Sequence, residues 1–292
     1  MLALASWVVA LALGQASDPY VRSRVVAGDS SSQALFWNQP RIDWQQSSLG
    51  NPNMNPHTEF DAVREAFKSW QTLFTRCGNL DFAEGPLVDA RKVGFTRDGD
   101  NQNLVLFRMT RCKSFVDASD ACWKAGTCAN LYDCWDDEDG TLAVTLTTYD
   151  ERSGIIRDSD ISFNAATYTF TTGSGAPCVL VPGPNCASTD VQNTATHEIG
   201  HLVGLDHTRA AGSIMNRSSS PGELSKRVID SGSSEFVCVT YPKGGMSQSS
   251  PHPVVDLELG PKAGCAAAGG GFSALALLGL GVLARSRRRG VR

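Results

Sequence analysis

The stretch "HEIGHLVGLDH", residues 197 to 207, holds three of the five histidines of a 292-residue chain. On a helix His197 and His201 lie one turn apart, so both imidazoles leave the same face and can meet one metal ion. Gly204 allows the chain to turn, which brings His207 back toward the same point. Three imidazoles and one open position describe a catalytic zinc site, because a structural zinc would take a fourth protein ligand. The competing explanation is an accidental crowding of histidines.

This stretch ends a longer segment, "STDVQNTATHEIGHLVGLDH", whose apolar spacing predicts a helix. Ser188, Thr189 or Asp190 can cap its first turn, and Gly204 is a natural terminator. Glu198 stands beside the first predicted ligand, where its carboxylate can reach a zinc-activated water without binding the metal itself. We therefore expect Glu198 to act as the general base of a catalytic site.

The remaining elements are predicted from periodicity. Apolar residues repeat in steps of three and four over residues 58 to 74, which predicts a helix, and Thr58 with Asp61 resembles a capping box at its start. A short third helix is predicted over residues 233–242, and strands are predicted over residues 34–45, 80–84, 103–109, 142–150 and 160–170. Strands with interleaved helices packed on one sheet define an α+β domain.

"HEIGHLVGLDH" also matches the HExxHxxGxxH signature of the metzincin metallopeptidases. Eight residues after His207, Met215 in "SIMN" stands where that clan has its Met-turn, the hydrophobic floor beneath the metal. The layout between residues 34 and 242 is similar to that of the matrixins within the clan. The resemblance implies a metzincin-like catalytic domain with a twisted, mostly parallel sheet, an active-site helix and a Met-turn.

The same resemblance implies a zinc endopeptidase that acts on protein or peptide substrates. The three histidines would hold one Zn²⁺, and Glu198 would carry the proton. An extended substrate would lie beside an edge strand, for which residues 160–165, "DISFNA", are the candidate. The alternative is a catalytically silent metzincin fold kept as a surface adhesion or binding module, against which the intact Glu198 argues. A non-peptidase zinc hydrolase agrees with the histidines alone but fits the Met-turn and the matrixin-like layout poorly.

Two positions depart from the patterns of the clan. Asn216 and Arg217 follow Met215, so the tyrosine that serves as a fifth ligand in astacins and serralysins is missing. Thr208 stands where matrixins usually carry serine. The resemblance to matrixins is therefore looser than the resemblance to the clan.

Further metal ions are a separate question. Matrixins often hold a second, structural zinc through additional histidines, but only His57 and His252 remain here, far apart in the sequence. We therefore predict a single zinc. Calcium is a candidate at the acidic segments 136–140 and 157–160, for which solvated acidic turns are the competing explanation.

The two ends of the chain carry signals of their own. Residues 1–16 form an uncharged apolar run that ends in small residues, which is typical of a secretory signal peptide, although a membrane anchor is the alternative. The catalytic domain is assigned to residues 17–243 and a Gly-, Ser- and Pro-rich linker to residues 244–264.

Residues 265–292 combine Cys265, an apolar stretch and an arginine cluster. This order resembles the myxobacterial C-terminal sorting tail. The resemblance implies that a sorting protease removes the tail near Cys265 and that the body reaches the cell surface, the outer membrane or the medium. A permanent anchor, with the tail in the membrane, is the alternative.

Nine cysteines in an exported chain indicate disulfides. Cys178 and Cys186 are the one local pair that we predict, and the cysteine-dense insert over residues 112–140 is expected to carry its own bridges. A zinc ribbon in the insert is disfavoured because it has no CxxC pair. "RCGN" at 76–79 resembles the cysteine switch of matrixin propeptides, but Cys77 follows the first predicted helix of the catalytic domain, so a disulfide is favoured. The eight body cysteines are Cys77, Cys112, Cys122, Cys128, Cys134, Cys178, Cys186 and Cys238.

The charge of the chain limits its partners. The formal net charge is −4, and five of the 26 basic residues follow Cys265, which leaves 21 basic against 30 acidic residues in the rest. Contact with nucleic-acid phosphates needs a basic face. We therefore expect no nucleic-acid partner.

Overall fold

A computed structural model describes residues 19–54, 56–179, 181–182, 185–248, 281–282 and 285–291. The signal peptide predicted for residues 1–16 lies outside the described residues. So do most of the predicted linker and the first part of the predicted tail, including Cys265. Among the described residues, no helix is both long and apolar enough to cross a membrane.

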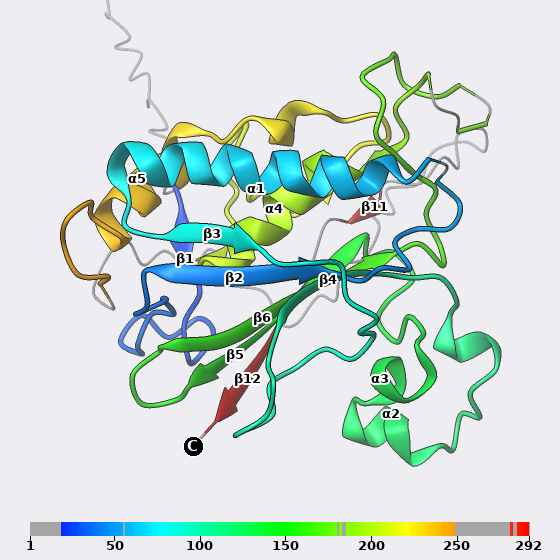
Figure 1. The fold of residues 1–292 in the computed structure, drawn as a ribbon, viewed down its shortest axis with the longest axis horizontal. Coiled ribbons are helices and arrows are strands. Elements are labelled where there is room, and N and C mark those ends of the chain that lie inside the picture. Colours follow the sequence, from blue (N-terminus) through cyan, green and yellow to red (C-terminus); the bar gives the residue numbers. More distant parts are fainter. Residues whose placement is uncertain are drawn as a thin grey trace, which may run out of the picture.

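One six-stranded sheet organises the fold, in the order β12-β5-β6-β4-β2-β3 (Figure 1). All neighbours pair in parallel except β5 and β6, which are antiparallel. The strands are β2 (Arg41–Gln46), β3 (Asp81–Glu84), β4 (Asn103–Arg108), β5 (Ala143–Asp150), β6 (Ile156–Asn164) and β12 (Arg285–Val291). The expectation of a mostly parallel sheet in an α+β domain is therefore confirmed.

The prediction that residues 160–165 form an edge strand is wrong. Residues 160–165 belong largely to β6, which lies between β5 and β4 and has no free edge. Apolar Ile161 and Phe163 alternate with polar residues in this strand, and such alternation fits an edge strand as well as a central one. The strand beyond β6 is β5, so β5 is the edge of the domain on this side, and β12 pairs with it.

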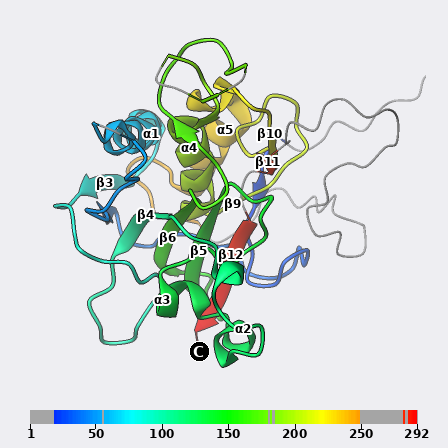
Figure 2. The same cartoon turned by 90° about the vertical axis from the view of Figure 1, so that its right-hand side faces the viewer.

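Three helices cover one face of the sheet (Figures 1 and 2): α1 (Thr58–Cys77), α4 (Val191–Leu202) and α5 (Ser231–Thr240). All three agree in position with the helices predicted from periodicity. Between them and the sheet lies the main hydrophobic core, in which Trp70, Phe74 and Phe236 are fully buried. Trp44 of β2 stacks on Phe67 of α1 with ring centroids 3.7 Å apart, which fixes helix against sheet.

The predicted capping box of α1 is wrong. His57, in a left-handed conformation, precedes the helix, and no side chain caps its first turn. Glu59 is fully buried instead, where its Oε1 accepts hydrogen bonds from the backbone N–H of Asn51 and from His57 Nδ1. The first turn is thus held by the preceding loop rather than by Thr58.

The cysteine-dense insert packs against the opposite face of the sheet. It contains the short helices η1 (Cys112–Ser114), α2 (Ala121–Ala125) and α3 (Cys128–Tyr132), so it has more regular structure than the loop that the sequence suggested. Two disulfides within it, Cys112–Cys134 and Cys122–Cys128, form a small buried cluster of their own. The expected internal bridging is confirmed.

The other two disulfides also agree with the predictions. Cys178 pairs with Cys186, and Cys77 at the end of α1 pairs with Cys238 of α5. All eight body cysteines are therefore bridged, and Cys77 lies in the core between two helices rather than at a metal. The cysteine-switch alternative is excluded in this state of the chain.

Shorter elements complete the chain. The predicted strand over residues 34–45 forms only from Arg41, because the segment before it makes isolated bridges to other parts of the chain. The remaining elements are β1 (Val21–Arg22), β7 (Phe170–Thr171), β8 (Thr189–Asp190), β9 (Leu205–Asp206), β10 (Ser218–Ser219), η2 (Ser225–Arg227) and β11 (Gly281–Val282).

Candidate metal centre

His197 and His201 project from α4, and His207 follows one residue after β9. Their ligand atoms all lie within 4.8 Å of one another, and no other cluster of this kind occurs in the described part of the chain. His197 and His201 are buried and His207 is partly buried. The prediction that the three histidines meet is confirmed.

The helix carrying two of these histidines begins and ends as its sequence suggests. Asp190 is the N-cap, and its carboxylate accepts a hydrogen bond from the Asn193 N–H. At the other end Gly204 has φ +102°, and a Cβ there would meet the carbonyl oxygen of Leu35. The chain can therefore reverse only with glycine at this position, and the reversal returns His207 to the ends of the other two imidazoles.

Backbone carbonyls orient two of the imidazoles. His197 Nδ1 lies 2.5 Å from the carbonyl oxygen of Ile214, and His201 Nδ1 lies 2.8 Å from that of Leu205. Because a carbonyl oxygen can only accept, each Nδ1 carries a proton, which leaves Nε2 of each ring as the nitrogen that can offer a lone pair to a metal. This is the arrangement by which metal-binding histidines are held in one tautomer.

The ring nitrogens that face one another fit a metal ion. His197 Nε2 is buried without a hydrogen-bond partner, and His201 Nε2 lies 3.2 Å from His207 Nε2. Burial, followed by the neighbouring His201, Lys226 and His207, holds the pKa of His197 well below its usual value, so the ring stays neutral. A divalent cation satisfies the orphaned nitrogen, and three imidazoles suit zinc.

Glu198 lies beside this cluster but faces β5. Its carboxylate accepts a 2.6 Å hydrogen bond from the hydroxyl of Thr145, while its other oxygen, Oε1, is buried without a partner. Burial raises the pKa of Glu198 to about 8, against the opposing effect of the Thr145 hydrogen bond. A cation at the histidines would stabilise the carboxylate, which leaves Glu198 positioned to exchange protons rather than to bind the metal.

Met215 packs directly beneath α4. It is fully buried, and a Cβ placed on Gly200 would overlap its sulfur. Its carbonyl accepts a hydrogen bond from the N–H of Thr208, which ties the residue after His207 to the methionine. Gly200 therefore lets the methionine approach the face of α4 that carries the two histidines.

We expect Gly200→Ala to destabilise the fold and weaken zinc retention. The new Cβ would overlap Met215 Sδ and lie 3.1 Å from its Cε, so the methionine must move. Overpacking of this kind typically costs about 1–3 kcal/mol. Denaturant unfolding with and without zinc measures the effect, and Gly140→Ala is the matched control because nothing lies within 4 Å of its Cβ position. Equal unfolding free energies for the two variants would contradict the packing role of Gly200.

Asp230 holds the segment around Met215, a role that was not predicted from the sequence. Asp230 caps α5 through the Ser233 N–H, and its Oδ2 accepts hydrogen bonds from the Ile214 N–H and the Ser213 hydroxyl. The carbonyl of the same Ile214 orients His197. Asp230 thus links the start of α5 to the imidazole, and the only sequence signal for it is its place before a predicted helix.

Lys226 fixes the segment after Met215. Its Nζ is buried and donates to the carbonyl oxygens of Asn216 and Ser218, and its N–H donates to Asn193 of α4. Burial lowers the pKa of Lys226 to about 8. Residues 216–219 are therefore tied to α4, the helix that carries His197 and His201.

Large aromatic residues support the end of α4. Trp70 Nε1 donates to the carbonyl of Thr196, and Trp37 Nε1 donates to that of Leu202. The Tyr241 hydroxyl donates to the carbonyl of Val203. These buried hydrogen bonds satisfy backbone carbonyls within α4 and just after it. The three donors come from separate parts of the chain, and together they hold the helix that carries His197 and His201 in place.

The acidic segment 157–160 does not form a solvated turn. Asp158 and Asp160 lie buried on β6, and Asp160 accepts hydrogen bonds from the backbone N–H groups of Gly94 and Leu104. Burial raises the pKa of both carboxyls, to about 9 for Asp158, where repulsion by Asp160 adds to it, and to about 6 for Asp160, where the hydrogen bonds from Leu104, Gly94 and Asp158 oppose it. The pair can therefore be neutralised by a retained proton without a cation.

The fold and the site together fit a metzincin-like α+β domain with three histidines that could hold a metal ion. In agreement, the family model of the matrixins matches residues 121–231, a segment that runs from the insert to the start of α5 and contains all three histidines, Glu198 and Met215. The match supports a matrixin-like domain with catalytic zinc. No curated protein matches the chain.

Proposed function

We propose that this protein is a zinc-dependent endopeptidase that hydrolyses peptide bonds of protein substrates. The observation that carries the proposal is the meeting of three histidine ligand atoms within 4.8 Å beside the buried carboxylate of Glu198. A purely structural metal site would have no need for a carboxylate that is held next to the ligands by Thr145.

The three imidazoles would hold Zn²⁺, which polarises the scissile carbonyl and lowers the pKa of its water to ~7. Glu198 accepts the proton of the attacking water and later delivers it to the departing amine. Thr145 keeps the carboxylate in place through its hydrogen bond to Oε2, and Oε1, which has no partner, is free to take the proton.

Met215 is proposed to form the Met-turn floor, since it packs against Gly200 on the ligand-bearing helix. The edge of β5 is proposed to align an extended substrate, because Thr145 of this strand contacts Glu198. Residues 216–219, held by Lys226, form the facing wall.

The rival function is a silent binding module with the same fold. Casein hydrolysis, measured with zinc and with chelator, distinguishes the two functions. We expect zinc-dependent cleavage, whereas zinc binding without any cleavage would favour the binding module.

Export and processing are further parts of the proposal. A signal peptide over residues 1–16 and a sorting tail over residues 265–292 would deliver the body to the cell surface, the outer membrane or the medium, with a sorting protease acting near Cys265. Four disulfides agree with an oxidising compartment. The intact mass of the exported protein tests the tail, which is lost under this proposal and retained in a permanent anchor.

Calcium is a secondary proposal. Of the two acidic segments, residues 136–140 of the insert are the better candidate, because the buried pair on β6 is able to keep a proton instead. A calcium-dependent rise in the unfolding midpoint of the zinc-loaded protein would support it.

A further inference from the structure

Two short strands near the C-terminal end of the sequence lie on the two walls of the candidate active site. β11 pairs antiparallel with β10, so that Val282 lies opposite Ser218 and Gly281 lies opposite Ser219. β10 belongs to the wall after Met215 and is held by Lys226. β11 therefore covers part of residues 216–219, which the proposed function places beside the substrate.

The second strand covers the facing wall. β12 pairs in parallel with the outer edge of β5 from Arg285 opposite Val144 to Val291 opposite Asp150. In this register Ser286 lies opposite Thr145, whose hydroxyl holds Glu198. An extended substrate and β12 would use the same backbone N–H and C=O groups of β5, so the two exclude each other.

The chain crosses from one wall to the other between Val282 and Arg285. Three residues span at most about 10 Å when extended. Val282, on the strand that pairs with residues 218–219, therefore lies within about 10 Å of Arg285, where the strand on the edge beside Glu198 begins. β11 and β12 therefore lie along the path that a substrate between these walls would take.

The reactive atoms are closed off in this arrangement. Glu198 and His197 have no exposed surface, and His197 Nε2 and Glu198 Oε1 are buried without partners. A substrate carbonyl and a water molecule must reach this place for hydrolysis to occur. The described conformation therefore leaves these two atoms inaccessible, while His207 stays partly exposed.

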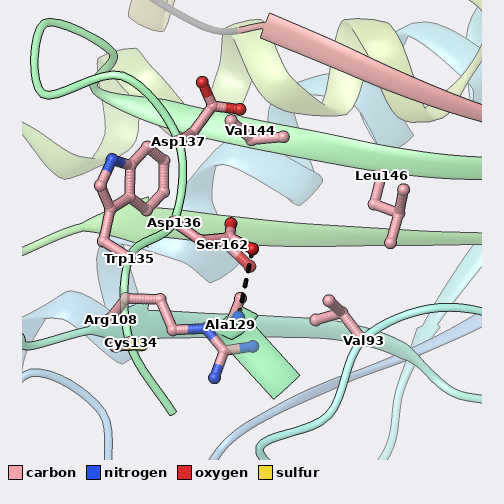
Figure 3. A pocket seen from close by; sticks show the side chains of 10 residues that line it. All are labelled: Val93, Arg108, Ala129, Cys134, Trp135, Asp136, Asp137, Val144, Leu146 and Ser162. Carbon is pink, nitrogen blue, oxygen red and sulfur yellow. Dashed lines mark hydrogen bonds between the residues drawn. The ribbon is translucent and has the colours of Figure 1, made fainter. Parts of the chain in front are cut away.

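Charge favours the docking of this segment. Four of the five residues 285–289 are arginine, whereas residues 136–139 of the insert are all acidic. Asp136 and Asp137 line a pocket together with Val144 and Leu146 of β5, and Figure 3 shows β12, in red, running alongside that strand. The basic segment thus pairs with the edge that lies next to the acidic end of the insert.

We propose that β11 and β12 close the active site, β12 by adding a strand to the edge of β5, and that the chain gains activity when these two strands leave. The inference rests on the proposed peptidase function. Cleavage near Cys265, as proposed above, would remove the closing segment together with the rest of the tail.

The full-length chain with Arg287→Pro and Arg288→Pro tests this closure. Proline has no N–H, and of two consecutive strand residues one directs its N–H toward β5, so the double variant must lose a ladder bond. Arg287→Ala with Arg288→Ala is the matched control, because it removes the same charges and keeps both N–H groups. The readouts are kcat/KM on a quenched peptide pool and hydrogen exchange of the backbone amides of β5.

We expect the proline variant to show a kcat/KM at least about tenfold above wild type, with faster exchange in β5. This factor corresponds to a wild-type chain in which the closed state outnumbers the open state about 10:1. The alanine variant should stay within about threefold of wild type. Opening in both variants would also support closure and would assign the docking to the arginine charges. Wild-type values of both readouts in the proline variant would overturn the closure.

The two proposals fail differently. Faster exchange in β5 without cleavage by any form would retain the docking and refute the peptidase function. Zinc-dependent cleavage that is equal in all forms, with unchanged exchange in β5, would retain the peptidase and refute the closure.

Discussion

Glu198→Gln is expected to lower kcat/KM by about 10³- to 10⁴-fold while the protein keeps its zinc and its fold. Glutamine has nearly the same shape and can still accept the hydrogen bond of Thr145, but it cannot take up the proton of the attacking water. Glu198→Ala should lose activity by a similar factor. Metal analysis and the unfolding midpoint, measured beside turnover, separate lost chemistry from lost structure.

The outcome of this substitution decides the role of the carboxylate. Zinc content near one ion per chain with lost turnover agrees with proton transfer by Glu198. Near wild-type turnover in either variant would contradict the proposed mechanism. Loss of zinc in Glu198→Gln would instead make the carboxylate part of the metal site.

Joint replacement of Cys77 and Cys238 by alanine is expected to have the largest effect on stability. Their disulfide links α1 to α5 across 161 residues, and the chain-entropy argument gives roughly 5 kcal/mol for a loop of this length. The control is the pair Cys178 and Cys186, separated by 8 residues, for which the same argument gives roughly 2.5 kcal/mol. Denaturant unfolding of the oxidised proteins compares the two losses.

The same variant tests the cysteine-switch alternative. A thiol that blocks zinc would, when removed, raise peptidase activity without loss of stability. We expect the reverse, which is lower stability and no gain in activity. Higher turnover of a stable Cys77→Ala protein would show that Cys77 acts at the metal.

Local signals made much of the site predictable from sequence. The spacing of His197 and His201 on a periodic helix places both rings on one face, and Asp190 and Gly204 mark its ends as capping rules require. His207 meets them because the chain reverses at the glycine. These features depend on neighbours within about two helical turns, which is the range that a single sequence reveals.

Contacts between distant segments were not predictable. Thr145 reaches Glu198 only because β5 lies antiparallel beside β6, and Asp230 reaches Ile214 only because α5 packs near α4. Strand order is not encoded in the apolar pattern of one strand, so β6 was mistaken for an edge. The capping box predicted for the start of α1 is wrong for a related reason. The buried Glu59 accepts its hydrogen bond from the preceding loop, and this contact is not visible in the local sequence.

The end of the sequence illustrates the same limit. The apolar run and the arginines predict a tail that is sorted or anchored. Neither feature indicates that the tail pairs with a strand of the domain. The pairing of Arg285–Val291 with β5 depends on which strand has a free edge. That property belongs to the folded sheet.

Peptide-library cleavage tests the central claim most directly, with the wild-type chain and the Arg287→Pro/Arg288→Pro chain compared as zinc-loaded, chelated and zinc-restored proteins. We predict cleavage by the zinc-loaded proline variant, its loss on chelation and its return with zinc. Cleavage that survives complete removal of zinc, or no cleavage by either zinc-loaded chain, would contradict a catalytic zinc at His197, His201 and His207.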